Sequence, residues 1–210
     1  MLIVGINASP FDDPHNTEHD TARVLKEALA AARECSATEI DWIHLPEDLP
    51  HCDGRREETR YSLEERIQRL PKKGSLEETI RRMIAADGIL LCGPTYTFSA
   101  ESRTCALLAW CEITTDYPEY CLKGKVAGLI SVCEEDGGQS ANERKFSPCN
   151  HMGMIIPPFC SHFYNKHASK SEGDHQKYGH ILVGRNVARM IRILQGEILP
   201  QDWDDFSASW

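Results

Sequence analysis

Three loops of the sequence place polar, aromatic or glycine residues directly after a short apolar run. The runs with their loops are Leu2–Ile6 before Asn7-Ala8-Ser9-Pro10, Ile89–Cys92 before Gly93-Pro94-Thr95-Tyr96, and Val126–Val132 before Cys133-Glu134-Glu135-Asp136-Gly137-Gly138-Gln139. Near-continuous apolar runs are typical of buried parallel strands, and open α/β sheets bind ligands beyond the carboxyl ends of their strands. The three loops are therefore the candidate site.

The first loop has the groups that hold an anion. Ser9, Asn16 and Thr17 supply hydroxyl and amide groups before a segment with helical periodicity. Thr17-Glu18-His19-Asp20 has the form of a helix N-terminal cap, and the backbone N–H groups of a helix start bind phosphate. A helix that begins at Asp20-Thr21 keeps the same apolar face, because four residues are about one turn. The sequence leaves both starts open.

The charge of this loop opposes the same phosphate. Four carboxylates crowd it, from Asp12, Asp13, Glu18 and Asp20. A phosphate monoester carries nearly two negative charges, so each carboxylate that faces it weakens binding. His15 and His19 are the candidates for a compensating positive charge. The alternative interpretation is a solvated turn in front of a capped helix.

The second loop suits a flat aromatic ligand, and the third loop carries a pair of glycines. Tyr96 and Phe98 offer aromatic surface, and Pro94 stiffens the exit from the strand before Thr95. Gly137-Gly138 allows a close backbone approach or a positive φ angle. Both aromatic side chains could instead pack against the following helix, and a plain turn would also favour the two glycines.

The elements that position these loops alternate between strand and helix. The expected strands are Leu2–Ile6, Glu39–His44, Gly88–Cys92, Lys125–Cys133 and Met154–Pro157. The expected helices are Thr17–Glu34, Ser75–Ala86 with a capping box at Ser75-Leu76-Glu77-Glu78, Ser102–Thr114, Ser140–His151 and Tyr178–Gln195. Right-handed crossovers then predict a three-layer α/β/α fold, with a five-stranded parallel sheet in the flavodoxin-like order 2-1-3-4-5.

Length and composition favour one globular domain over residues 1–210, in which 41% of residues are apolar. Residues 51–74 are a charged excursion with a short helix around Leu63–Leu70, and residues 200–210 are an acidic tail. The net charge of −9 disfavours a general nucleic-acid binder. No stretch is long and apolar enough for a membrane span or a signal peptide, so a cytoplasmic location is expected. The nine scattered cysteines are expected to be reduced.

Several motifs in order resemble the flavodoxin-like NADPH-dependent FMN reductases and their iron-sulfur flavoprotein relatives. They are Asn7-Ala8-Ser9-Pro10 with Asn16-Thr17, Ala86-Asp87-Gly88-Ile89-Leu90 before Gly93-Pro94-Thr95-Tyr96, Gly137-Gly138-Gln139, and His151-Met152-Gly153-Met154. The chain departs from the family at Phe11, which replaces a basic residue. It also departs at Cys52, because one thiolate cannot hold an iron-sulfur cluster.

The resemblance implies an FMN-dependent oxidoreductase that takes hydride from NAD(P)H and passes electrons to a small-molecule or flavin acceptor. It implies a homo-oligomer, and we name no catalytic side chain and no metal ligand. The implied cofactor contacts are Ser9, Phe11, Asn16, Thr17, Pro94, Thr95, Tyr96, Phe98, Gly137 and Gly138. The alternative is a non-catalytic electron carrier or binding module of the same fold, with or without flavin.

Overall fold

The computed structural model describes residues 1–11, 19–36, 38–54, 60–115, 119–168 and 175–198. The expectations for Asn16, Thr17, His15 and the tail at 200–210 therefore lie outside the described residues. The described strands are β1 (Leu2–Asn7), β2 (Glu39–His44), β3 (Gly88–Tyr96), β4 (Ser99–Ala100), β5 (Val126–Cys133) and β6 (Ser161–Asn165). The helices are α1 (Asp20–Cys35), α2 (Leu63–Gln68), α3 (Leu76–Ala85), α4 (Ser102–Thr115), α5 (Gly138–His151) and α6 (His175–Leu194).

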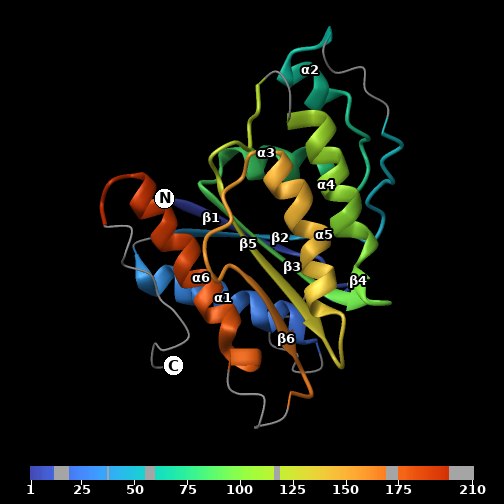
Figure 1. The fold of residues 1–210 in the computed structure, drawn as a ribbon. Helices are drawn as coiled ribbons and strands as arrows, with labels where there is room; N and C mark the ends of the chain where they lie inside the picture. Colours follow the sequence, from blue (N-terminus) through green and yellow to red (C-terminus); the bar gives the residue numbers. More distant parts are fainter. Residues whose placement is uncertain (12–18, 37, 55–59, 116–118, 169–174, 199–210) are drawn as a thin grey trace.

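The sheet has the order β2-β1-β3-β5-β6, and these five strands are parallel (Figure 1). The two-residue strand β4 pairs with the end of β3 in the antiparallel direction. Counted without β4, this is the order expected from the sequence. The flavodoxin-like α/β fold is therefore confirmed.

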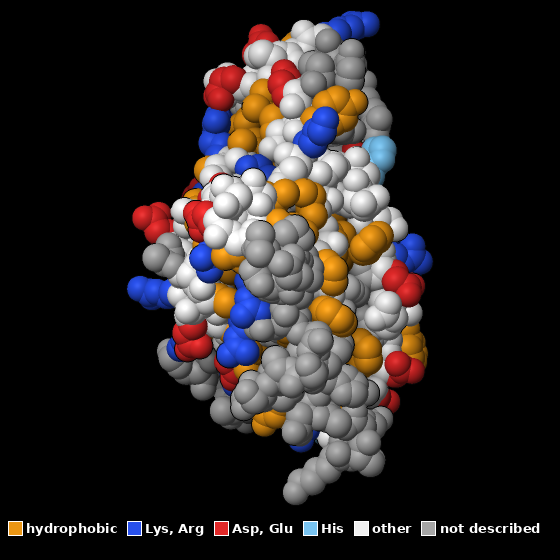
Figure 2. Space-filling view, turned by 60° about the vertical axis from the view of Figure 1, so that its left-hand side comes forward, with side chains coloured by type: hydrophobic (Ala, Val, Ile, Leu, Met, Phe, Trp, Pro, Cys, Tyr) orange, Lys and Arg blue, Asp and Glu red, His pale blue; other side chains and the backbone are white. Residues whose placement is uncertain are grey.

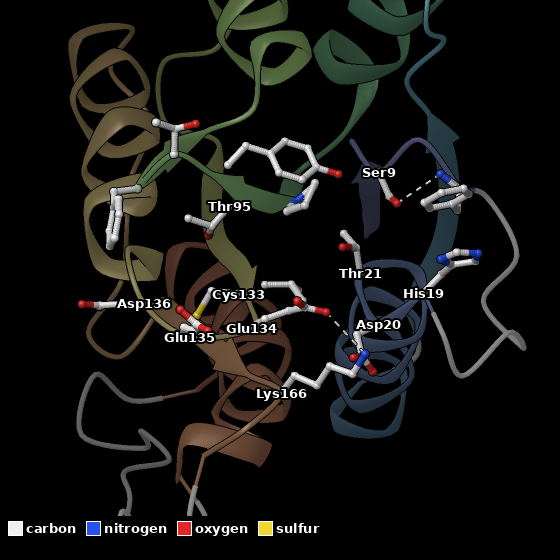
Figure 3. Close-up of a pocket in the computed structure, with 16 residues that line it drawn as sticks. Ser9, His19, Asp20, Thr21, Thr95, Cys133, Glu134, Glu135, Asp136 and Lys166 are labelled. Atoms are coloured by element: carbon white, nitrogen blue, oxygen red, sulfur yellow. Dashed lines mark hydrogen bonds and ion pairs between the residues drawn. The ribbon is translucent and has the colours of Figure 1, made fainter.

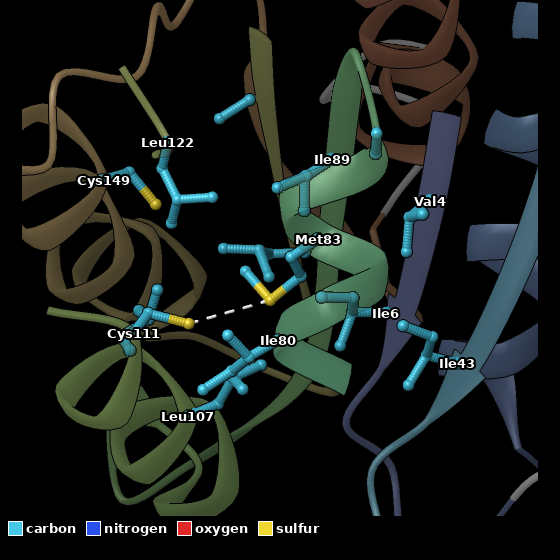
Figure 4. Packing of buried hydrophobic residues seen from close by; sticks show 14 of the residues in the cluster. Val4, Ile6, Ile43, Ile80, Met83, Ile89, Leu107, Cys111, Leu122 and Cys149 are labelled. Atoms are coloured by element: carbon cyan, nitrogen blue, oxygen red, sulfur yellow. Dashed lines mark hydrogen bonds between the residues drawn. The ribbon is translucent and has the colours of Figure 1, made fainter. Parts of the chain in front are cut away.

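Helices cover both faces of the sheet, which explains why the central strands β1, β3 and β5 are largely apolar and buried. On one face, Met83 of α3 and Leu107 and Cys111 of α4 are almost fully buried against Ile89 of β3 (Figure 4). The Cys111 thiol lies 3.7 Å from the Met83 sulfur. On the other face, α1 and α6 pack against the sheet through a second buried cluster, so the molecule has three layers.

The fifth parallel strand is not where the sequence indicated it. Met154–Pro157 forms no strand, and only Ile155 makes a bridge, with Val126 of β5. The chain then reaches Pro157 and Pro158, whose nitrogens have no hydrogen to donate to a sheet ladder. Regular pairing with β5 begins at Ser161, so the expectation for this strand was wrong by about seven residues in position.

The same four residues, Ser-Leu-Glu-Glu, stand at the start of α2 and of α3, and only the copy at α2 forms a capping box. Ser62 accepts a hydrogen bond from the backbone N–H of Glu65, whose carboxylate in turn accepts from the Ser62 backbone at 2.8 Å. Ser75 instead adopts a left-handed backbone conformation with φ of 47° and makes no side-chain cap. The expected capping box at Ser75 was therefore wrong, because the cap requires an extended backbone at the serine.

Charges of both signs are interspersed on the coloured part of the surface that Figure 2 shows. A broad field of one sign does not form on that part of the surface. Within the described residues, no helix is both long enough and apolar enough to cross a bilayer.

Candidate functional site

A cavity of about 550 Å³ lies at the edge of the sheet where the parallel strands end (Figure 3). Its walls come from the loops after β1, β3 and β5, together with the start of α1 and the residue after β6. Six of the residues expected from the sequence line it: Ser9, Phe11, Pro94, Thr95, Tyr96 and Phe98. Asn16 and Thr17 lie outside the described residues, and Gly137 and Gly138 are not among the lining residues.

The first loop is held in shape at its base by Asn7, which is fully buried. The Asn7 side-chain oxygen accepts from the backbone N–H of Ser9 at 3.0 Å, and its amide nitrogen donates to the Phe11 carbonyl at 3.1 Å. The Ser9 hydroxyl accepts from the backbone N–H of Phe11 at 3.1 Å. These bonds fix the direction in which the chain leaves β1.

Helix α1 begins at Asp20, the later of the two starts that the sequence left open. His19 occupies the N-cap position and makes no side-chain cap hydrogen bond. The His19 side chain therefore does not cap the first-turn N–H groups of α1, which are the groups that bind an anion at a helix start. The His19 ring stacks on the Phe11 ring, with centroids 3.6 Å apart and planes 11° apart, and both line the cavity.

Two ion pairs between described residues lie around the start of α1. The Asp20 carboxylate accepts two hydrogen bonds from Arg23, at 2.6 and 3.2 Å. Lys166 lines the cavity from the residue after β6, and its ammonium lies 3.5 Å from a Glu134 carboxylate oxygen. Figure 3 shows its side chain reaching toward Asp20.

Lys166 was missed from the sequence because the fifth strand was placed too early. The aromatic residues Phe163 and Tyr164, which follow the two prolines and favour a strand, were the signal that could have found it. A strand over Ser161–Asn165 brings Lys166 to the same edge as the three loops.

The aromatic wall of the cavity is carried by the tight β3–β4 hairpin. Its two turn residues, Thr97 and Phe98, both have positive φ angles, 51° and 58°. Left-handed backbone is strained in residues other than glycine, and such strain gathers at functional sites. Tyr96 is 53% exposed and Phe98 66% exposed, so most of their surface is not packed against α4.

Three further residues, Thr95, Gly137 and Gly138, contribute to the structure of this aromatic wall. The Thr95 hydroxyl is buried and has no hydrogen-bond partner within the described part of the chain. Gly137 has φ of 83°, and a Cβ there would lie 2.6 Å from the Phe98 Cα. A Cβ on Gly138 would lie 2.4 Å from the Phe163 Cβ. The two glycines therefore permit close packing beneath the cavity wall and the start of α5, rather than a plain turn.

Two buried side chains of opposite charge, Lys145 and Glu101, lie next to strand residues that adjoin the cavity lining. Lys145 of α5 is fully buried and donates to the Ile130 carbonyl at 2.6 Å and to the Ser131 hydroxyl at 2.9 Å. Ser131 pairs with Gly93 in the sheet, one residue before a pair whose members both line the cavity. The Glu101 carboxylate packs against Gly93, 2.5 Å from where a Cβ would stand.

Lys145 and Glu101 each favour the charged form of the other side chain. Burial raises the pKa of Glu101, and the positive charge of Lys145 opposes that rise. Burial lowers the pKa of Lys145, and the carboxylate of Glu101 opposes the fall. One Glu101 oxygen accepts from the Thr104 backbone at 2.8 Å at the start of α4, while the other has no partner among the described residues. The pair therefore ties α4 and α5 to strand residues that adjoin the cavity lining.

The described residues provide no metal site, since no three histidine, cysteine or acidic side chains gather suitably among them. Cys133 is the one cysteine among the residues that line the cavity. Its thiol donates to the Tyr164 carbonyl at 3.5 Å, and burial raises its pKa. A thiol held protonated in this way is a poor nucleophile.

The sequence model of the NADPH-dependent FMN reductase family matches residues 1–167, most of the chain. The chain belongs to this family. Membership confirms the resemblance noted in the sequence and supports a flavin-dependent oxidoreductase, with FMN as cofactor and a reduced pyridine nucleotide as co-substrate. Among curated proteins, no sequence matches the chain.

Solved structures of flavin proteins share the fold of this FMN reductase family member at low identity. RosB with bound 8-demethyl-8-formylriboflavin-5'-phosphate is 13% identical, with a TM-score of 0.70 over 93% of this chain and 81% of that chain. A flavodoxin, WrbA-like protein from Agrobacterium tumefaciens is 14% identical, with a TM-score of 0.59 over 91% and 98% of the two chains. An FMN-dependent NADH-azoreductase from Bacillus anthracis, in complex with FMN, is 15% identical, with a TM-score of 0.58 over 90% and 99%.

The buried pair generates a prediction about stability. The Lys145→Met variant leaves Glu101 without its counter-charge, so we expect it to lose about 3 kcal/mol of unfolding free energy, as when one partner of a buried pair is removed. The Lys145→Met, Glu101→Gln double variant should recover a large part of this loss. Urea denaturation of both single variants and the double variant measures the coupling. Losses that simply add would contradict the pairing.

Proposed function

We propose that this protein is an FMN-dependent oxidoreductase that takes electrons from NAD(P)H and passes them to a small-molecule or flavin acceptor. The observation that carries the proposal is the division of the cavity into two chemically different ends. One end is the uncapped start of α1 beside Lys166, and the other is the exposed aromatic hairpin at Tyr96 and Phe98. A phosphate joined to a flat ring requires both ends.

The phosphate end of the cavity suits FMN without the family's basic residue. The first-turn N–H groups of α1 and the Ser9 hydroxyl would hold the phosphate, and Lys166 would supply the positive charge that Phe11 cannot. Asp20 opposes the phosphate only weakly, because its carboxylate is already engaged by Arg23. The cavity therefore fits an anion even though several carboxylates surround it.

The ring end of the cavity suits the isoalloxazine. When bound, FMN supplies the hydride and electron chemistry of the site. The chain would orient the ring between the 95–98 hairpin and the 132–136 loop, with the Thr95 hydroxyl as an available polar contact. The two walls would also exclude water from one side of the ring.

A homo-oligomer is proposed from the family resemblance alone. The apolar-rich segment Cys105–Trp110 of α4 is a candidate contact between copies, but its Leu107 and Leu108 are buried in the core. The Trp110 indole donates to the Pro50 carbonyl at 2.8 Å, so the chain itself covers part of this helix. The structure of α4 therefore adds no support, and the oligomeric state stays a prediction.

The first test of the proposed function is an absorption spectrum. Purified protein mixed with FMN should shift the flavin bands, and anaerobic addition of NADPH or NADH should bleach them. A protein that binds FMN but is not reduced by either nucleotide would be an electron carrier, the alternative function. A flavin spectrum that the protein leaves unchanged would contradict both.

The second test concerns the charge at the phosphate end. We expect Lys166→Gln to weaken FMN binding about tenfold, because a charge-assisted hydrogen bond to phosphate is lost. Riboflavin, which lacks the phosphate, should bind this variant and the wild type equally. Lys73→Gln, which removes an exposed lysine from the 51–74 excursion, is the matched control for net charge. Calorimetry measures the affinity of each of the three proteins for both ligands, and equal losses for FMN and riboflavin in Lys166→Gln would exclude a phosphate role for Lys166.

A further inference from the structure

A second cavity, of about 510 Å³, lies on the other side of the aromatic hairpin. One wall is the hairpin itself, and the other is one face of α5, whose residues recur at helical spacing. The lining residues are Thr97, Phe98, Ser99, Ser140, Glu143, Arg144 and Ser147. Four of these seven carry hydroxyl groups, which donate hydrogen bonds readily to phosphate oxygens.

Arg144 is the cation that lines this second cavity. It is exposed and makes no hydrogen bond or ion pair with the residues that the structure describes. Arg23 and Arg82, by contrast, are each bonded to two carboxylates. A planar guanidinium without a carboxylate partner, set among hydroxyls, is the arrangement that binds phosphate in two-point fashion.

One carboxylate also lines the second cavity. Glu143 opposes an anion there, but its Oε1 accepts from the Gln139 side chain at 3.3 Å. Gln139 lies one turn toward the start of α5, so this bond joins Glu143 to the helix surface. The net charge of the cavity is therefore near zero, and the selectivity for an anion comes from the free guanidinium and the hydroxyls.

The two cavities share a wall. Thr97 and Phe98 line both of them, so a ligand in the main cavity can extend over this ridge into the second. The other rim of the main cavity carries Glu135 and Asp136, whose carboxylates repel phosphate groups, and Glu134, which is paired with Lys166. A long ligand with several phosphates that extends out of the main cavity is therefore expected to extend on the side of Arg144.

We propose that the second cavity binds the adenosine 2'-phosphate end of NADPH while the nicotinamide end occupies the main cavity. This inference rests on the proposed function for its choice of ligand. Arg144 would be the phosphate ligand, supported by Ser140 and Ser147 on the same face of α5. NADH lacks the 2'-phosphate, so Arg144 would determine the preference for NADPH.

The test uses adenosine 2',5'-bisphosphate, which carries the proposed phosphate and no nicotinamide. By calorimetry, wild type should bind it more tightly than adenosine 5'-monophosphate. The Arg144→Gln variant should bind the bisphosphate at least tenfold more weakly and lose the preference over the monophosphate. The Arg144→Lys variant should lose less affinity for the bisphosphate, and the Glu143→Gln variant should bind it more tightly. Arg33→Gln, an exposed arginine near the far end of α1, is the charge-matched control and should bind as wild type does.

A kinetic readout separates this inference from the proposed function. In FMN-loaded protein, Arg144→Gln should raise the KM for NADPH at least tenfold and leave the KM for NADH and both kcat values nearly unchanged. Equal bisphosphate affinity in Arg144→Gln and wild type, or equal KM changes for the two nucleotides, would overturn the inference. A failure to bind FMN would instead count against the proposed function, since bisphosphate binding does not require flavin.

Discussion

The parallel alignment of β1, β3 and β5 is the constraint on which the site depends. Asn7 pairs with Cys92, and Pro94 pairs with Val132, so these strands end side by side at one edge of the sheet. Consecutive parallel strands must be joined by crossover connections, which are usually helices, and these helices cover both faces of the sheet. The carboxyl edge is then the place where backbone groups, side chains and the start of α1 can meet a ligand.

The site is supported by polar groups that are unusual in a core. A fully buried lysine is rare unless it is paired, and Lys145 has two hydrogen-bond acceptors and the opposite charge of Glu101. The same pair touches β3, β5, α4 and α5 beside strand residues that adjoin the cavity lining. These buried contacts fix the elements that carry the cavity walls, including the hairpin whose residues Thr97 and Phe98 have a strained left-handed backbone.

Strand order and most of the cavity could be predicted from the sequence, because buried parallel strands are apolar throughout and end at distinctive loops. Local signals failed where tertiary packing decided the outcome. An apolar run at Met154–Pro157 resembled a strand but ended at a second proline, and this error concealed Lys166. Identical Ser-Leu-Glu-Glu sequences gave a cap at Ser62 and none at Ser75, because the backbone at the second serine is left-handed.

The most direct test of the account is a crystal structure of the protein with FMN. The account predicts the phosphate within hydrogen-bond distance of the first-turn N–H groups of α1 and of the Lys166 ammonium. It predicts the ring between the 95–98 hairpin and the 132–136 loop. A flavin found elsewhere, or one whose phosphate faces away from the start of α1, would contradict it.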